Sequence, residues 1–334
     1  MRRGPVYLLV HLFVCAGWLP EPALADSRPS ERGSLTLLFE NDLFFHTDRD
    51  YTNGVLAAYT TAPNDTPGWA RDAAHLLPFF PQTDDVRASF ALGQNMYTPT
   101  DVSLANPPRS ERPYAGYLYG ALGLVAEEDD HLDQLQLQVG VIGPASLAEQ
   151  TQKFVHKVVH ATHPEGWDTQ LKNEPGLVLI YERSWRNRDP WKVMGLSVEI
   201  NPHVGAAVGN VYDYANAGAM MRFGYDLFDD YGPMRIDPGL PGSNFYEPRD
   251  GDFSWYVFAG VDGRLMGRNL FLDGNTFARS RSVAKLPLVG DLQFGAAISF
   301  RHIRIAFTHV FRTKEYHTQP GVDQFGAVSV SFRF

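Results

Sequence analysis

The sequence predicts an all-β protein, an antiparallel transmembrane β-barrel of about 12 strands with a short amphipathic helix in the connection after strand 5. Three observations predict this class. The chain opens with an export signal, apolar and polar residues alternate with period two, and the polar faces carry Gln, Glu and Arg. Such side chains are costly against a packed core but not against a wet lumen.

The N-terminal segment has the features of a signal peptide for Sec-dependent export. Two arginines precede an apolar run from Val6 to Leu19, and a small-x-small triplet ends at Ala25. We therefore divide the chain into a signal peptide, 1–25, and an outer-membrane β-barrel domain, 26–334. The only cysteine, Cys15, lies in the signal, so the mature protein has no disulfide.

The charge of the chain argues against nucleic-acid binding. The formal net charge is −9, and loss of two arginines and one glutamate with the signal leaves −10. After the signal no run of about 18 apolar residues appears, so membrane insertion requires barrel strands or surface binding. We expect a monomer in the outer membrane of a Gram-negative cell, with no nucleic-acid partner.

The clearest alternation is LDQLQLQVGV, residues 132–141, where leucines and valines share one face and three glutamines the other. The pattern returns in KVMGLSVEIN, 192–201, and in the terminal FGAVSVSFRF, whose last phenylalanine is typical of outer-membrane barrels. A soluble β-sandwich also alternates. The export signal, the polar faces and six aromatic residues near strand ends favour the barrel. We expect those six to form interfacial girdles: Tyr117, Tyr119, Trp185, Trp191, Trp255 and Tyr256.

One segment, residues 143–176, departs from the strand periodicity. Its residues 147–160 predict a helix after Pro144. Leu147, Phe154 and Val158 share one face of that helix. The opposite face is polar: Glu149, Gln152, His156 and His160. We expect this polar stripe to lie beside the barrel wall or across its mouth.

The stretch FENDLFFHTDRDYTNG, residues 39–54, ends an apolar strand with Glu40, Asn41 and Asp42. On an extended strand Asn41 and Asp42 point to opposite faces, so both reach one site only if the strand ends or bulges there. Their side-chain oxygens suit Ca²⁺, together with backbone carbonyls or Thr52. A plain polar hairpin loop fits this pattern equally well.

The helix offers chemistry of its own. His156 is a candidate general base, and Gln152, one turn earlier, is placed to orient a water or a substrate carbonyl. A merely solvated histidine is the alternative. A zinc pair with His160 lacks the glutamate that the metalloprotease motif requires after its first histidine. A serine nucleophile, Ser103 or Ser146, lacks a G-x-S-x-G elbow.

The loop NPPRSERPYAGYLYG, residues 106–120, contributes Arg109 and Arg112 at the start of a strand. Guanidinium groups bind phosphate and carboxylate, which are the charged groups of outer-leaflet glycolipids. We expect these two arginines to bind substrate, although arginine is also ordinary at a barrel rim.

Five motifs in order, FENDLF, DRDYTNG, ERPYAGYLYG, VGVIGPASLAEQTQKFVHK and GWDTQLKNEPG, resemble the LpxR-type lipid A 3′-O-deacylases, a family of outer-membrane barrels. The likeness spans nearly the whole mature chain. It implies a barrel that removes the 3′-linked acyloxyacyl group of lipid A in the outer leaflet, with Ca²⁺ as cofactor. Lipid A of the lipopolysaccharide would be the substrate, and the outer membrane the location.

The resemblance also implies site residues. It carries the family's catalytic positions onto His156, Asn41, Asp42, Thr52 and Gln152. It further implies a phospholipase A2-like mechanism, in which His156 activates a water and a Ca²⁺ held by Asn41 and Asp42 stabilises the oxyanion.

One position departs from the family pattern. Some members carry a glutamate where this chain has Thr162, and the nearest acid here is Glu165. Which group orients His156 is therefore open at this point, as is the exact form of lipid A. Two alternatives remain: a non-enzymatic barrel, porin or adhesin-like, and a serine-type esterase barrel whose activity survives chelation.

Overall fold

The computed structural model describes residues 32–42, 50–128, 130–187, 189–246 and 252–334. The predicted signal peptide lies outside the described residues, as do residues 43–49 of the first hairpin.

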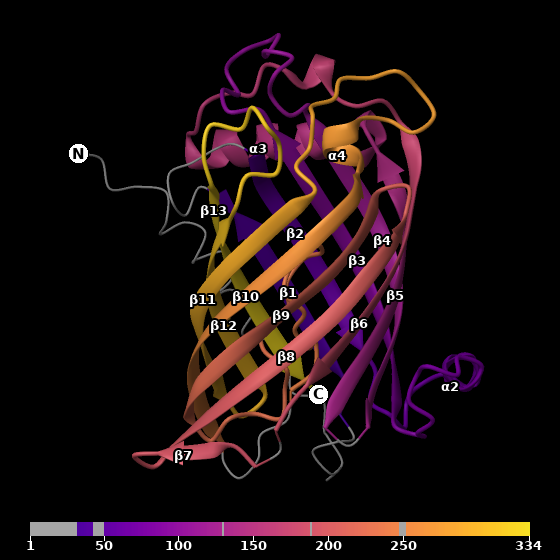
Figure 1. Ribbon diagram of the computed structural model, residues 1–334, viewed down its shortest axis with the longest axis vertical. Coiled ribbons are helices and arrows are strands. Elements are labelled where there is room, and N and C mark those ends of the chain that lie inside the picture. Colours follow the sequence, from indigo (N-terminus) through magenta and orange to yellow (C-terminus); the bar gives the residue numbers. More distant parts are fainter. Residues whose placement is uncertain (1–31, 43–49, 129, 188, 247–251) are drawn as a thin grey trace.

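Twelve antiparallel strands form a closed barrel, which confirms the predicted fold class (Figure 1). Pairing of the first strand with the last, and of β6 with β8, closes the wall. The wall strands are β1 (Ser34–Asn41), β2 (Asp50–Thr60), β3 (Val86–Thr98), β4 (Ala115–Glu128), β5 (His131–Ile142), β6 (Glu174–Trp185), β8 (Leu196–Gly209), β9 (Tyr212–Tyr225), β10 (Phe253–Asn269), β11 (Leu288–Phe300), β12 (Ile303–Arg312) and β13 (Asp323–Arg333).

Shorter elements complete the fold. The helices are α2 (Gly68–His75), α3 (Ala148–Val159) and α4 (Leu270–Asp273), and the 3-10 turns are η4 (Pro144–Ser146) and η5 (Trp167–Thr169). The short strand β7 (Trp191–Val193) pairs with β8 as a hairpin. The predicted helix after strand 5 is α3. In the described part of the chain, no helix combines the length and hydropathy that a membrane span needs.

Side chains alternate across the wall as a transmembrane barrel requires. On β10, Val257, Val261 and Leu265 are exposed on the outside, while Asp262 and Arg264 are buried toward the lumen. The outer face is therefore apolar and suits lipid, and charged groups are kept inside.

The lumen is filled by the connection between β9 and β10. We call residues 226–246 of this connection the lumen segment. Its Arg235 donates from Nε to Glu40 Oε1 of β1 at 2.5 Å, and its Asp237 accepts from Gln136 Nε2 of β5 at 3.1 Å. Because β1 and β5 lie well apart in the wall, these bonds hold the segment across the interior.

The two ends of the barrel differ. Helices α3 and α4 lie at one end among long connections, whereas α2, β7 and the C-terminus lie at the other (Figure 1). Outer-membrane barrels have their longer loops outside the cell, so we assign the α3 end as extracellular.

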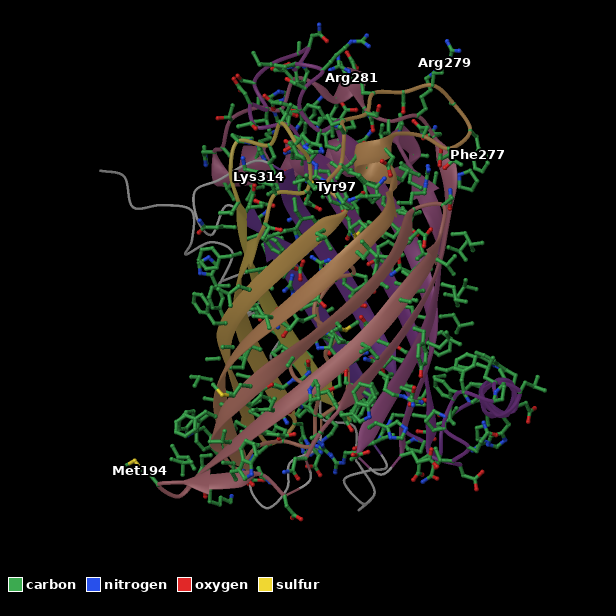
Figure 2. All side chains as sticks on the ribbon, in the orientation of Figure 1. Tyr97, Met194, Phe277, Arg279, Arg281 and Lys314 are labelled. Carbon is green, nitrogen blue, oxygen red and sulfur yellow. The ribbon has the colours of Figure 1, made fainter. Side chains whose placement is uncertain are left out.

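Two local predictions are wrong. KVMGLSVEIN is not one strand, because Met194 (φ 53°) and Gly195 (φ 84°) form a turn that separates β7 from β8. Met194 is the exposed tip of that hairpin (Figure 2). Three of the six expected girdle residues, Tyr117, Tyr119 and Tyr256, are buried inside the barrel, because they share the lumen-facing parity of their strands.

The connection between β2 and β3 contains α2. Ala70 and Ala74 of this helix pack in one buried cluster with Val86 of β3 and Leu124 of β4. The exposed face of the helix carries Trp69. The short length of α2 hides it from a search for apolar periodicity.

Candidate active site

The end of β1 and a bulge in β2 form one half of the candidate site. The register of β2 on β3 shifts between Tyr51 and Asn53, so Thr52 is the extra residue of a β-bulge. Asn41, the last residue of β1, donates from Nδ2 to the Thr52 carbonyl at 3.0 Å. The Thr52 hydroxyl bonds to the Thr98 hydroxyl of β3 at 2.6 Å. The strand end that the acidic stretch predicts is present, and the bulge lies on its partner.

Strand parity places this half of the site on the outside of the wall. Leu38 and Glu40 face the lumen, where Leu38 joins the interior cluster and Glu40 binds Arg235. Asn41 therefore has outward parity. Asp42 follows the strand end and is fully buried.

Helix α3 forms the other half and also lies on the outer side of the wall. Its Ala148 packs with Met96, an outward residue of β3. On β4, Gly116 makes this approach possible, since a Cβ there would lie 2.1 Å from Ser146 Oγ and 2.3 Å from Ala148 Cβ. Only glycine lets the helix approach the wall this closely.

The polarity of α3 is inverted relative to a helix in water. Its buried side carries Gln152 and His156, 2% and 3% exposed, whereas Leu147 and Phe154 are 52% and 68% exposed. The predicted division into an apolar and a polar face is present. The environment decides which face is covered, and an exposed apolar face suits a helix bordered by lipid.

The hydrogen bond of His156 fixes its tautomer. Its Nδ1 lies within hydrogen-bond reach of the backbone carbonyl of Thr162. A carbonyl only accepts, so Nδ1 carries the proton and Nε2 keeps a lone pair. The chain position where some family members have a glutamate thus orients His156 through its backbone. Glu165 instead pairs with the exposed His163 at 3.0 Å.

Gln152 is held by a residue to which the sequence assigned no role. Trp167 of η5 donates from Nε1 to Gln152 Oε1 at 2.7 Å. Trp167 is 1% exposed and belongs to the same buried cluster as Met96 and Ala148. The only signal for Trp167 in the sequence is its place in the GWDTQ motif.

Strand β3 joins the two halves. Met96 and Thr98 point to the same face of β3, because they are two residues apart. Met96 contacts the cluster under α3, and Thr98 binds Thr52. Thr98 was missed by the sequence reasoning, and nothing in its local pattern marks it.

The donor chemistry near Asn41 fits Ca²⁺. Within the described ranges, no group of three or more His, Cys, Asp or Glu side chains could hold a metal ion. Asn41 turns its amide nitrogen to Thr52, which leaves Oδ1 on the opposite side of the amide. Oδ1, the Asp42 carboxylate and nearby backbone carbonyls are all hard oxygen donors, the type Ca²⁺ prefers. Asn41 and Asp42 are therefore the residues that would hold this ion.

The two arginines expected to bind substrate are in different environments. Arg109 is exposed at the extracellular end. Arg112 is 1% exposed, pairs with Glu315 at 3.0 Å and stacks over the Tyr97 ring at 4.8 Å. A guanidinium held in this way stabilises the barrel mouth, and contact of Arg112 with substrate stays a prediction.

The serine candidates lack the setting of a nucleophile. Ser103 donates its hydroxyl to Asp101 Oδ1 at 2.6 Å. The hydrogen bonds from the Ser103 hydroxyl and backbone N–H lower the pKa of Asp101. A carboxylate with a lowered pKa is a weaker base, so Asp101 accepts the hydrogen bond of the hydroxyl but is poorly suited to remove its proton. Ser146 is fully buried under Gly116. Neither serine is hydrogen-bonded to a histidine in a contact that the structure shows.

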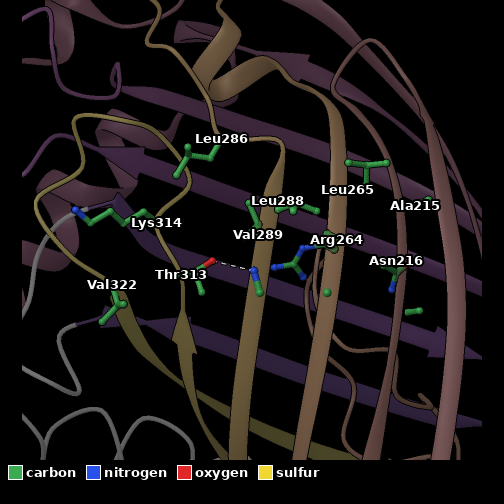
Figure 3. Close-up of a pocket in the computed structure, with 13 residues that line it drawn as sticks. Ala215, Asn216, Arg264, Leu265, Leu286, Leu288, Val289, Thr313, Lys314 and Val322 are labelled. Atoms are coloured by element: carbon green, nitrogen blue, oxygen red, sulfur yellow. Dashed lines mark hydrogen bonds between the residues drawn. The ribbon is translucent and has the colours of Figure 1, made fainter.

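A shallow trough of about 940 Å³ lies on the other side of the barrel (Figure 3). Its lining comes from β9, β10, β11 and the connection after β12, and includes Ala215, Leu265 and Leu288. None of the candidate site residues lines it. The trough is therefore separate from the site between α3 and the wall.

Comparisons with known proteins agree with this architecture. A family model described as "Outer membrane protein LpxR" matches residues 8–334. The chain is similar to the solved structure of LpxR from Salmonella typhimurium, with 21% identity, 90% of this chain and 100% of that chain covered, and a TM-score of 0.73.

Two autotransporter domains also match. The β-domain of Bordetella Brka has 6% identity, coverage of 91% of this chain and 97% of that chain, and a TM-score of 0.40. The translocator domain of NalP from Neisseria meningitidis has 10% identity, coverage of 98% of this chain and 95% of that chain, and a TM-score of 0.38.

Comparison with curated proteins gives no match. Because the family model spans nearly the whole chain, the protein belongs to the LpxR family of outer membrane proteins.

Proposed function

We propose that the protein is a lipid A 3′-O-deacylase that hydrolyses the 3′-linked acyloxyacyl ester in the outer leaflet. The observation that carries this proposal is the buried His156 on the outer side of the wall, whose Nδ1 donates to the Thr162 carbonyl in the tautomer that makes Nε2 the basic nitrogen. The family resemblance supplies the substrate. On this proposal the base lies on the outer side of the wall, the side from which a membrane lipid arrives.

In the proposed mechanism His156 acts as general base. Nε2 takes a proton from a water, and the oxygen of that water attacks the ester carbonyl carbon. The tetrahedral intermediate then collapses as the carbon–oxygen bond to the sugar breaks. The imidazolium returns its proton to the leaving sugar hydroxyl, and the acyloxyacyl chain leaves as the carboxylic acid.

Asn41 and Asp42 would hold a Ca²⁺ ion, and Gln152 and Thr52 would shape the space beside it. When bound, the ion would supply Lewis-acid stabilisation of the developing oxyanion, worth several kcal/mol. The bond between Asn41 and Thr52 holds the amide oxygen in one orientation, which favours a preformed binding corner.

The location of the site favours a substrate that enters from the membrane. Phe154 and Leu147 of α3 expose apolar surface beside the site, as acyl chains would require. His156 and Gln152 are closed to water in this structure. A substrate must therefore displace part of their cover, which also keeps bulk water away from the reacting ester.

The filled lumen argues against the porin alternative. A porin conducts through an open interior, whereas Arg235 and Asp237 hold the lumen segment across this barrel. A porin also has no need for a buried histidine outside the wall. The exposed Arg109 remains our proposal for a residue that binds the phosphate groups of the substrate.

Mass spectrometry of lipid A tests the proposal. Cells that express the wild type in Ca²⁺ should lose the 3′-acyloxyacyl chain, and cells that express His156→Ala or Asp42→Ala should retain it. Unchanged lipid A in wild-type cells would contradict the enzyme assignment. Activity that survives EDTA would contradict the calcium role and favour the serine-type alternative.

A further inference from the structure

One buried donor lies on the helix that carries His156, the amide nitrogen of Gln152. Nε2 is buried, and no hydrogen-bond partner for it is present among the described residues. An amide nitrogen carries two donor hydrogens, and a buried donor without an acceptor is unfavourable. Beside a candidate base, such an atom is explained if its acceptor arrives with a ligand.

The orientation of this amide follows from the chemistry of Trp167. The indole N–H can only donate, so the atom that it meets at 2.7 Å must be the amide oxygen. If the Gln152 amide were flipped, its NH₂ group would face the indole N–H, and two donors would oppose each other. Trp167 therefore turns Nε2 away from itself. Gln152 and His156 are one helical turn apart, so both side chains lie on the buried side of α3.

Trp167 is itself fixed. Its ring lies 4.9 Å from the Tyr114 ring, and the Tyr114 hydroxyl donates to the Val102 carbonyl at 3.1 Å. At Gly166 a Cβ would lie 2.4 Å from the Tyr114 ring, so only glycine allows the tyrosine to pack this closely. The indole thus has one position, and a rigid donor orients its acceptor.

We propose that Trp167 is a positioning residue, which sets the Gln152 amide so that Nε2 donates to the carbonyl oxygen of the ester attacked beside His156. The inference rests on the proposed function, and it adds a residue that acts through Gln152 rather than on the substrate. The donor would strengthen its bond as negative charge develops on that oxygen. Trp167 should therefore affect kcat more than KM.

A double-mutant cycle tests this role. The mature protein in detergent micelles is supplied with CaCl₂ and lipid A that carries the 3′-acyloxyacyl chain, and initial rates are measured by mass spectrometry. Trp167→Phe keeps an aromatic ring but removes the N–H, and we expect kcat to fall about tenfold with little change in KM. Gln152→Met should lower kcat about 10²-fold. The double variant should be no slower than Gln152→Met alone.

Two further variants separate positioning from folding. Trp191→Phe makes the same change on exposed β7, at the other end of the barrel, and should keep wild-type kcat. Gln152→Glu retains an oxygen for Trp167 but replaces Nε2, so it should fold and still lose kcat. This variant remains decisive if Trp167→Phe does not fold.

The outcomes separate a failure of the positioning role from a failure of the proposed function. Wild-type kcat in Trp167→Phe or in Gln152→Glu would overturn the positioning role. A loss in the double variant equal to the product of the single losses would do the same, because independent residues act additively in free energy. A wild type that releases no acyl chain would instead overturn the proposed function.

Discussion

The lumen and the outer wall each bury a histidine, and the two differ in what surrounds them. His203 on β8 and His156 on α3 are both 3% exposed. In the lumen, His203 Nε2 meets Asp262 Oδ2 at 3.0 Å, and Asn216 donates to the same oxygen. On the outer wall, His156 donates to a neutral backbone carbonyl. Because the two histidines are equally buried, burial does not tell them apart. The hydrogen-bond partner and the side of the wall make His156 the candidate for catalysis.

The strongest test of this comparison replaces each histidine in turn. His156→Gln should lower kcat by about 10²–10⁴, because it removes the general base. His203→Gln should leave kcat nearly unchanged and lower the free energy of unfolding by about 1–3 kcal/mol, because it weakens the hydrogen bonding of buried Asp262. Rate assays and denaturant unfolding in detergent measure both. Equal losses of kcat would remove the distinction between the two faces.

A second test addresses the lumen alone. Asp230 of the lumen segment accepts hydrogen bonds from Arg222 and Arg304, all three fully buried. Asp230→Ala leaves two buried guanidinium groups without this partner and should reduce the free energy of unfolding by about 3–5 kcal/mol. The folded fraction should keep its kcat. As control, Asp252→Ala removes an exposed aspartate and should change stability by less than about 0.5 kcal/mol.

A third test moves α3 without touching its polar residues. Gly116→Val introduces a Cβ into contact with Ser146 and Ala148, which pushes the helix off the wall. Because a displacement of about 1 Å can cost about 10²-fold, we expect a loss of that order in kcat. Gly120→Val is the matched control on the same strand and face, where a Cβ would have its nearest neighbour at 3.9 Å. Similar rates in both variants would argue that α3 does not carry the base.

The smallest effect is expected at Glu165. This side chain and its partner His163 are about half exposed and pair at 3.0 Å. Since the Thr162 carbonyl orients His156, Glu165→Gln should change kcat little. A large loss, measured in the same rate assay, would mean that this carboxylate supports the imidazole during turnover.

The sequence predicts the barrel because lipid and lumen impose a strict alternation on every strand. It also predicts α3, whose period differs from that of the strands. The turn at Met194 and Gly195 escapes prediction, because both flanking segments continue the same alternation across it. The sequence also does not predict that the lumen is filled. Arg235 and Glu40 are 195 residues apart in the chain, and no local pattern links residues so far apart.

The candidate site shows the same limit. Asn41, Thr52 and His156 are recognisable by type and by resemblance. The side of the wall on which they lie depends on strand parity and on the bulge for Asn41 and Thr52, and on the packing of α3 for His156. The bond from Trp167 to Gln152 joins a 3-10 turn to a helix. The group that orients His156 is a backbone carbonyl, which every residue has and no side-chain pattern can reveal.

The lumen segment has a consequence for the opposite face of the wall. It binds Glu40, which precedes Asn41 in β1, and its Asn244 donates to Thr60 of β2 at 2.7 Å. The two strands that present Asn41 and Thr52 to the membrane are thus supported from within. Ordering of these strands is complete when the barrel folds, so a lipid that binds as proposed would meet a stiff surface and would lose less binding free energy to ordering it. In this barrel the lumen segment supports β1 and β2 from inside the wall.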